Sequence, residues 1–219
     1  MNSKPHQTIT NIIGFMVAIL LVAGGCAPAA TPSPTPLPPT PIPPTSTPDP
    51  VNLVKAYEEA FNQKDMEALV PLFTEDIIFQ GGDWITPLYE AEIRAQHGYV
   101  FTRNQTLQNT DCVLAKDTVT CQAVIQDDCI TAGGLDGLHF SKIEYELVDG
   151  KIHQVTSLMA SEDAQNFWYF LFIPFRRWVD KNYHEDVSII FSGPDRLYKN
   201  PEAGQILSKL CKEYAATKQ

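Results

Sequence analysis

The spacing of apolar residues predicts an amphipathic helix at the start of the globular part, over residues 51–62. Its apolar positions recur at helical spacing: Leu53, Val54, Tyr57 and Phe61. Asp65 is a suitable N-cap for a short second helix, which Pro71 disturbs near its end. The strand-like run DIIFQ follows at 76–80. Two helices and a strand are therefore expected to open the folded part of the chain.

A turn and a third helix are predicted next. The run GGDW at 81–84 has the composition of a turn. Thr86 can cap a helix that has Pro87 at its first position, where a missing N–H costs no hydrogen bond. We expect this helix to run to about His97, just before Gly98.

Alternating apolar and polar residues predict two β-hairpins in the middle of the chain. The first, TDCVLAKDTVTCQAVIQ, turns at Lys116–Asp117, and the second, LHFSKIEYELVDGKIHQVTSLM, turns at Asp149–Gly150, a strong hairpin dipeptide. Alternation in the second hairpin places four apolar side chains on one face: Ile143, Tyr145, Leu147 and Ile152. An acidic, glycine-containing loop is expected between the hairpins, over 127–137.

Helical spacing of apolar residues returns over residues 164–179, where many of them are aromatic. Pro174 lies inside this run and implies a kink or a break into two helices. We expect the aromatic stripe to belong to the core, and a membrane-interface or partner-binding helix is the alternative. A final amphipathic helix is predicted over 202–216. Helices followed by antiparallel strands indicate an α+β fold, with helices on one face of a sheet.

The charge and the histidine spacing exclude two classes of function. The 219-residue chain has a formal net charge of −10, and its 16 Lys and Arg residues are scattered among 26 Asp and Glu residues. Nucleic-acid binding needs clustered basic residues, so no nucleic-acid partner is expected. His139 and His153 are not at metal-ligand spacing, and Asp127, Asp128 and Asp136 do not follow a calcium-loop pattern. We predict no metal and no cofactor.

The N-terminal region indicates export and attachment to a membrane. Residues 1–25 contain Lys4 and the apolar run IIGFMVAILLVA, which is too short to span a bilayer and suits a signal peptide. The sequence VAGGC resembles the lipobox of bacterial lipoproteins, which implies that Cys26 carries lipid and holds the protein on the extracytoplasmic side of the cell membrane. An uncleaved anchor or an ordinary signal peptide is the alternative.

Residues 27–50 have the composition of a tether. Eleven of these 24 residues are proline, which prevents a helix or a central strand. A polyproline-like chain of this length could extend about 70 Å. Together with Cys26 this segment is predicted to be a disordered stalk.

The cysteines suit an oxidising compartment. The chain has five, and lipidation of Cys26 would leave four. In the first hairpin a tight turn places Cys112 opposite Cys121, which suits a cross-strand disulfide, whereas a three-residue loop would break this register. By elimination Cys129 would then bond Cys211. The alternative is that two or more of these thiols are free and buried.

Two stretches of the chain resemble the nuclear transport factor 2-like superfamily, including its SnoaL-like branch. They are YEEAFNQKDMEALVPLFTEDIIF and YELVDGKIHQV, and the resemblance covers about residues 51–160. It implies a cone: a strongly bent antiparallel sheet wrapped around helices, with a pocket between them. Residues 161–219 are longer than the usual family ending and are expected to form a helical extension packed on the same domain.

Candidate site residues follow from that implied pocket. Active members of the family place an acid or a histidine there, but after the second hairpin turn this chain has Val155-Thr156-Ser157 on the last strand. Asp83 and His97 are the remaining candidates for a general base, although Asp83 could equally be a turn residue and His97 a helix-terminal residue.

Tyr57, Trp84 and Tyr145 could line the pocket, or they could simply pack in the core. We therefore predict non-catalytic binding of a small apolar ligand or a partner protein. The alternative is an isomerase- or dehydratase-type enzyme that uses Asp83 or His97. A homodimer through the open sheet face is a third hypothesis.

Overall fold

The structure is a computed structural model that describes residues 49–81, 84–193, 196–197 and 199–218, all within one compact unit, Thr45–Gln219. The predicted signal peptide, Cys26, nearly all of the tether and Asp83 lie outside the described residues. Among the described residues, no helix combines the length and the apolar character needed to span a bilayer.

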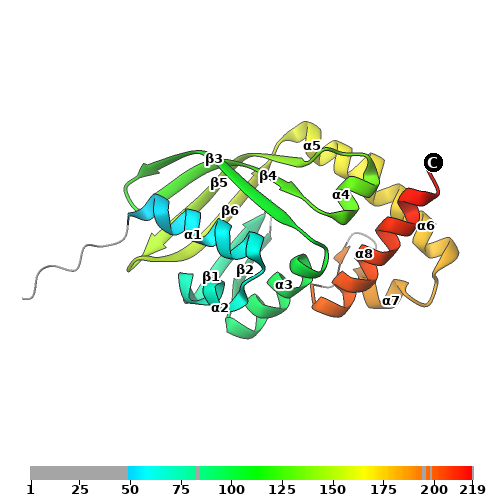
Figure 1. Ribbon diagram of the computed structural model, residues 1–219, viewed down its shortest axis with the longest axis horizontal. Coiled ribbons are helices and arrows are strands. Elements are labelled where there is room, and N and C mark those ends of the chain that lie inside the picture. The colour runs from blue at the N-terminus through cyan, green and yellow to red at the C-terminus, as the bar shows by residue number, and fades with distance from the viewer. Residues whose placement is uncertain (1–48, 82–83, 194–195, 198, 219) are drawn as a thin grey trace, which may run out of the picture. The chain divides into compact units, whose positions relative to one another are not determined.

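A curved sheet of six strands forms the body of this unit (Figure 1). The strand order is β2-β1-β6-β5-β4-β3. All neighbouring strands are antiparallel except β1 and β6, which are parallel, so the sheet is mixed. The strands are β1 (Phe73–Gly81), β2 (Trp84–Leu88), β3 (Thr106–Ala115), β4 (Thr118–Gln126), β5 (Leu138–Val148) and β6 (Lys151–Met159). The α+β fold class predicted from sequence is confirmed.

The helices form two groups. One group precedes β3: α1 (Pro50–Gln63), α2 (Met66–Leu69), the 3₁₀ turn η1 (Val70–Leu72) and α3 (Glu90–Thr102). The other comprises α4 (Asp128–Gly133), α5 (Ser161–Asn166), the π-helix η2 (Phe167–Phe172), α6 (Ile173–Asn182), α7 (Val187–Ile190) and α8 (Pro201–Ala216). A small sheet of β7 (Phe191–Gly193) and β8 (Arg196–Leu197) accompanies the second group. Figure 1 shows this second group gathered at one end of the large sheet.

The main core lies between the first group of helices and the large sheet. Tyr57 and Phe61 of α1, Ile77 of β1 and Tyr145 of β5 are all buried in it. The predicted first helix is confirmed, and Asp65 caps the short second helix by accepting a hydrogen bond from the Ala68 N–H at 3.0 Å. Alternate side chains of the strands point toward these helices, so one face of the sheet is buried.

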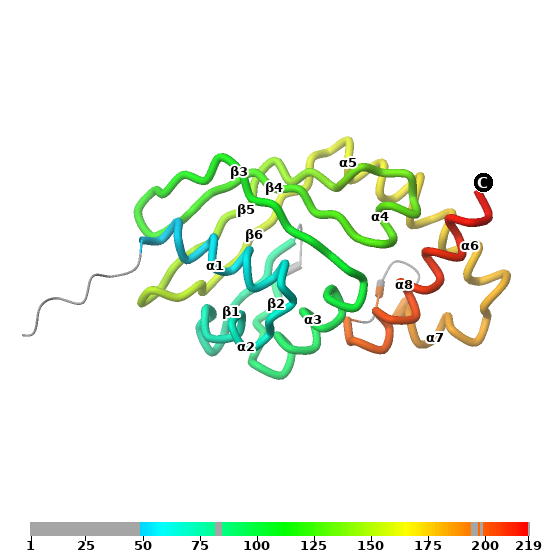
Figure 2. Tube along the Cα trace, viewed as in Figure 1, coloured from blue at the N-terminus to red at the C-terminus, as the bar shows by residue number. Residues whose placement is uncertain are grey.

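A second core joins the C-terminal helices to α3 and α4. Close approach of α3 and α8 is possible because glycines face the contact: a Cβ on Gly98 would lie 2.9 Å from Pro201, and one on Gly204 would lie 2.5 Å from the Tyr99 carbonyl oxygen. Figure 2 shows the trace of α8 coming close to the end of α3. Phe175, with side chains from α8, fills the space between the helices. The last helix, predicted over 202–216, is confirmed.

Two predicted boundaries are wrong. Thr86 and Pro87 do not start the third helix but lie in β2, an edge strand of the sheet, where proline is tolerated because one side needs no ladder hydrogen bond. The helix begins at Glu90, and Glu92 accepts a hydrogen bond from the Tyr89 N–H at 3.2 Å. It also continues past Gly98 to Thr102, because packing against α8 outweighs the low helix propensity of glycine.

The segment expected to be an acidic loop contains α4. Asp127 caps this short helix, since one of its carboxylate oxygens accepts hydrogen bonds from the N–H groups of Cys129 and Ile130 at 2.8 and 2.9 Å. Gly134 ends the helix in a left-handed conformation, with φ at 82°. The residues therefore include a clear N-cap and C-cap, which the sequence interpretation missed.

Both predicted hairpins are present. Asp149 and Gly150 have φ angles of 51° and 74°, the left-handed values that a tight turn of this type needs. In the first hairpin Val113 pairs with Thr120 as expected, and an irregularity in register follows toward Thr110. Both predicted cysteine pairs are at bonding distance, with S–S separations of 2.05 Å for Cys112–Cys121 and for Cys129–Cys211.

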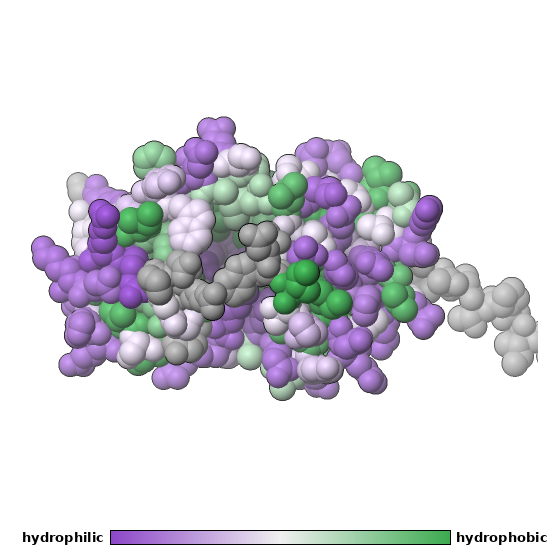
Figure 3. All heavy atoms as spheres, turned by 180° about the vertical axis from the view of Figure 1, so that it is seen from behind, coloured by the Kyte–Doolittle hydropathy of each residue, from purple (hydrophilic) through white to green (hydrophobic). Residues whose placement is uncertain are grey.

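The aromatic stripe of the C-terminal segment belongs mainly to the core. Leu171, Phe172, Phe175 and Val179 are buried, while Trp168 is 39% exposed. Pro174 lies in the first turn of α6, which directly follows the π-helix η2, so the helical run changes type immediately before the proline. On the face opposite to that of Figure 1, hydrophobic residues lie in separate small groups among hydrophilic ones (Figure 3).

Candidate functional site

A cavity of about 200 Å³ lies between one end of the large sheet and the C-terminal helices. Three of its lining residues are polar, namely Arg103, Gln105 and Asp127. The others form apolar walls: Ile125, Cys129, Ile130, Leu138, Phe140, Met159, Phe167, Leu171, Phe172, Phe175, Phe191, Leu197, Leu207 and Cys211. Ligand sites commonly combine apolar walls with a few placed polar groups, so this cavity is the candidate site.

The antiparallel topology brings three strand ends to the cavity. Ile125 lies near the end of β4, Leu138 opens the paired strand β5, and Met159 ends β6. Ile125 and Leu138 are direct register partners. The opposite wall comes from the extension, because η2 places Phe167 and Leu171 toward the cavity. The C-terminal segment is therefore part of the site itself.

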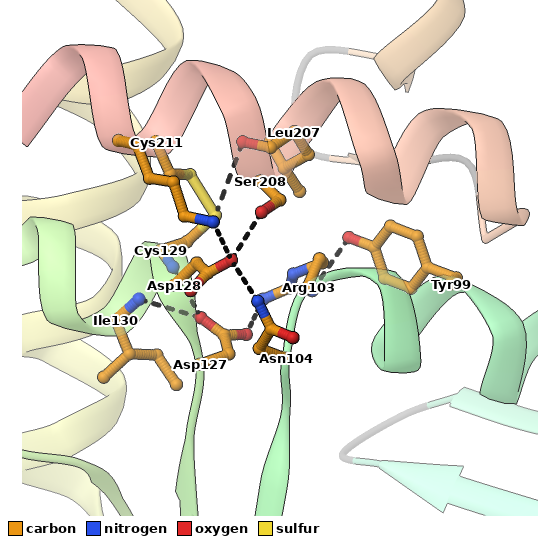
Figure 4. Close-up of a disulfide and its surroundings, with 11 residues drawn as sticks. Tyr99, Arg103, Asn104, Asp127, Asp128, Cys129, Ile130, Leu207, Ser208 and Cys211 are labelled. Carbon is orange, nitrogen blue, oxygen red and sulfur yellow. Dashed lines mark hydrogen bonds and ion pairs between the residues drawn. A yellow bond between two sulfur atoms is a disulfide. The ribbon is translucent and has the colours of Figure 1, made fainter. Parts of the chain in front are cut away.

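A buried ion pair forms the polar side of the cavity (Figure 4). Arg103 directly follows α3, and one of its terminal nitrogens pairs with the carboxylate of Asp127. The other donates a hydrogen bond to the Tyr99 hydroxyl at 2.9 Å. The side chains of Arg103 and Asp127 are only 13% and 1% exposed. The pair thus lies almost wholly out of water.

Electrostatics stabilise the charged form of Arg103. Burial acts to lower the pKa of its guanidinium, but Tyr99 and Asp127 raise it, and the net direction is upward. Asp127 is held independently, because its second oxygen caps α4. The arginine Nε–H is buried and has no hydrogen-bond acceptor among the described residues. One buried donor of this ion pair is therefore unmatched within the described protein.

A second set of contacts fastens α4 to α8 beside the cavity. Besides the Cys129–Cys211 bond, the Asp128 carboxylate accepts hydrogen bonds from Ser208 and from the Asn104 amide, and it pairs with Lys212 at 3.0 Å. Burial acts to raise the pKa of Asp128, but these partners lower it, and the net direction is downward. The geometry is visible in Figure 4, where the partners converge on one carboxylate.

Two of the pocket residues predicted from sequence, Tyr57 and Tyr145, lie in the main core. Tyr57 and Tyr145 are buried in the main core with their ring centroids 5.8 Å apart, and the Tyr145 hydroxyl donates to Asn109 at 3.0 Å. Trp84 opens β2, and its side chain lies outside the described residues, as does the whole of Asp83. Neither Tyr57 nor Tyr145 lines the cavity described above.

His97 lies among aromatic rings in the main core. It is 3% exposed, and its ring centroid lies between 5.7 and 6.4 Å from the rings of five residues: Tyr57, Phe61, Phe73, Phe79 and Phe101. Its Nδ1–H donates to the Ile93 carbonyl at 2.9 Å. Burial lowers its pKa to about 4, although that hydrogen bond acts in the other direction. His97 is thus neutral at pH 7 and is not a cavity residue.

Sequence reasoning missed Arg103, Gln105 and Asp127 as site residues. A usable signal was the Cys129–Cys211 pairing, which requires the start of α4 to lie against the last helix. No comparable signal marks Arg103, because its partners come from tertiary packing. Among the described residues, no group of His, Cys, Asp and Glu side chains is arranged to hold a metal ion.

Comparison with known proteins gives partial structural similarities. No family model and no curated protein matches the chain. Similar solved structures include an NTF2-like protein of unknown function from Cytophaga hutchinsonii, with 12% identity, a TM-score of 0.43, and coverage of 53% of this chain and 94% of that one. A cystatin-fold protein from Novosphingobium aromaticivorans shows 14% identity and a TM-score of 0.44, covering 50% and 97%.

A further similar structure is an enzyme. It is SalBIII, an epoxide hydrolase/cyclase-like protein of pyran ring formation in salinomycin, with 18% identity, a TM-score of 0.45, and coverage of 52% of this chain and 92% of that one. Similarity at this level carries no function over to the present chain. The strand order and the helix packing of this chain define its fold.

Proposed function

We propose that this chain is a lipid-anchored extracytoplasmic protein whose folded unit binds a small apolar molecule in the cavity without chemically changing it. The observation that carries the proposal is the cavity of about 200 Å³ with largely apolar walls. A dry apolar cavity of about 150 Å³ in another protein is large enough for benzene. A ring-sized molecule with a small substituent is therefore a suitable ligand.

The polar groups at the cavity favour binding over catalysis. Arg103 and Asp127 neutralise each other, and the second oxygen of Asp127 accepts two backbone N–H bonds. Both oxygens of this carboxylate are therefore already engaged by protein groups. His97, the alternative base, lies in the main core and has a pKa of about 4.

A cavity-filling substitution tests ligand binding. Leu138 is buried and lines the cavity, so Leu138→Phe should occupy part of the space and weaken binding of the hydrocarbon α-methylstyrene by about tenfold or more. Leu114→Phe is the matched control, since the same change falls on an exposed residue of β3. Binding is measured by ligand-observed NMR. Equal affinity of the two variants, or no binding by the unmodified chain, would refute the proposal.

The membrane anchor is tested separately. A lipid on Cys26 would place the protein in the membrane fraction of cells, and Cys26→Ser should move it to the soluble fraction and abolish incorporation of labelled fatty acid. Retention of the label in Cys26→Ser would contradict attachment at this residue. The result is independent of whether the cavity binds a ligand.

A further inference from the structure

The π-helix η2 presents two faces with different surroundings. In such a helix, side chains four or five positions apart share a face. Phe167, Leu171 and Phe172 are spaced in this way, and all three line the cavity. The run between them, residues 168–170, lies on the outer face of the helix and does not line the cavity.

The outer face of η2 exposes three consecutive aromatic side chains. Trp168, Tyr169 and Phe170 are 39%, 66% and 64% exposed. A shallow groove beside Trp168 and Tyr169 also includes Ala164 and Ile173 in its lining, which extends the apolar surface. Exposed apolar side chains are usually scattered singly, so a cluster of this kind indicates a contact surface.

The residue types indicate a lipid–water interface as the partner. Tryptophan and tyrosine are enriched where a membrane meets water, because their rings are apolar while their N–H and O–H groups stay hydrated. Charge does not provide the attraction, since the chain carries a net charge of −10 and an anionic surface would repel it. The aromatic side chains themselves therefore have to supply the contact, and neutral headgroups suit it.

The predicted tether is long enough for this contact, although it enters the folded unit at the other end. Helix α1 runs antiparallel to β3, because Glu58 bonds to Asn109 and Asn62 bonds to Leu107, so α1 starts near the turn between β3 and β4. The cavity lies at the opposite end of these strands, beside Ile125. The predicted reach of about 70 Å exceeds the width of about 40 Å expected for a compact unit of this size.

We propose that η2 is a membrane-contacting element: its outer aromatic face lies in the headgroup region of the bilayer that holds the lipid on Cys26, while its inner face lines the cavity. The proposal rests on the membrane anchor proposed above. Three side chains bind a bilayer only weakly by themselves, but tethering raises their effective concentration at the surface and keeps the contact occupied. The contact brings a wall of the cavity to the membrane, where apolar molecules concentrate.

Quenching of tryptophan fluorescence by brominated lipid measures this contact directly. The lipidated full chain is reconstituted in phosphatidylcholine vesicles with and without bromine on the acyl chains, and the unmodified chain should lose fluorescence in the brominated vesicles. Trp168→Phe should remove most of this loss. Trp178→Phe is the matched control and should keep the loss, because Trp178 packs against Phe175 and Tyr214 in the second core.

An added tryptophan tests the same surface without altering Trp168, and it keeps the test decisive if Trp168→Phe does not fold. Phe170→Trp should about double the loss of fluorescence, because two indole rings then lie in the interface. Val113→Trp should leave the loss unchanged, although Val113 is also 64% exposed and lies at the end of β3 where the tether enters. Equal losses in these two variants would show that the tether alone brings the chain near the lipid, and would overturn the proposal.

Sedimentation with the vesicles separates this contact from the anchor. A chain that sediments but shows no quenching of Trp168 would overturn the contact and leave the anchor standing. A chain that does not sediment would refute both. If Trp168 loses access to the water-soluble quencher acrylamide without being quenched by brominated lipid, a second copy or another part of the chain covers the aromatic side chains, and membrane contact is overturned.

Discussion

Acidification is expected to destabilise the folded chain through His97, which is buried among aromatic side chains in the main core. Its pKa falls from 6.5 to about 4, because burial disfavours the charged imidazolium. Between these values the unfolded chain binds a proton that the folded chain does not. The stability contributed by neutral His97 is thus fully present above pH 6.5. It is lost as the pH falls from 6.5 to about 4, and it declines no further below about pH 4.

The size of the effect follows from the shift. One pKa unit corresponds to about 1.4 kcal/mol, so the full pKa shift of His97 corresponds to a loss of about 3 kcal/mol of stability. Most of this, about 2 kcal/mol, should already be lost at pH 5. Urea denaturation followed by circular dichroism at pH 8 and at pH 5 gives the two free energies of unfolding.

A substitution isolates the contribution of this histidine from other titrating groups. His97→Leu cannot take up a proton, so its free energy of unfolding should fall by about 2 kcal/mol less than that of the unmodified chain between pH 8 and pH 5. His184→Leu controls for the general effect of removing an imidazole, since His184 is exposed. The reasoning fails if His97→Leu and the unmodified chain lose the same stability over this range.

Two further predictions concern the packing of α8. Removing the Cys129–Cys211 bond by double alanine substitution should lower the free energy of unfolding by about 2 kcal/mol more than removing Cys112–Cys121. The reason is that the two bonds close loops with sequence separations of 82 and 9, and the longer loop constrains the unfolded chain more. Urea denaturation of both double variants measures the difference. Gly204→Ala should lower the free energy of unfolding by about 1–3 kcal/mol, because the added methyl group would crowd the backbone of α3. Gln205→Ala is the control on the exposed side of α8 and should change the free energy of unfolding by less than about 0.5 kcal/mol.

The sequence predicted those parts of the fold that depend on local periodicity. The first helix, the last helix and the Asp149–Gly150 hairpin are all present, since each has a clear repeat or a specific turn dipeptide. The third helix was misplaced because Pro87 suits both a helix start and an edge strand, and only the sheet pairing of β2 decides between them.

The candidate site was less accessible to prediction. An aromatic residue such as Tyr145 has the same local pattern whether it lines a pocket or fills a core, and here it fills the core. Arg103 and Asp127 are 24 residues apart, and their pairing depends on how β3 and β4 lead back to α4. Such a site is defined by long-range packing, to which composition and spacing give little access.

The position of α8 has a consequence for the order in which the protein acquires its proposed function. The sheet and α1 come from the first part of the folded unit, whereas Leu207 and Cys211 of α8 complete the wall of the cavity. Synthesis proceeds from the N-terminus, so the sheet can form while the last helix is still being made. The cavity is closed only when almost the whole chain has been released, and nascent or truncated chains would therefore have the scaffold before they have the site.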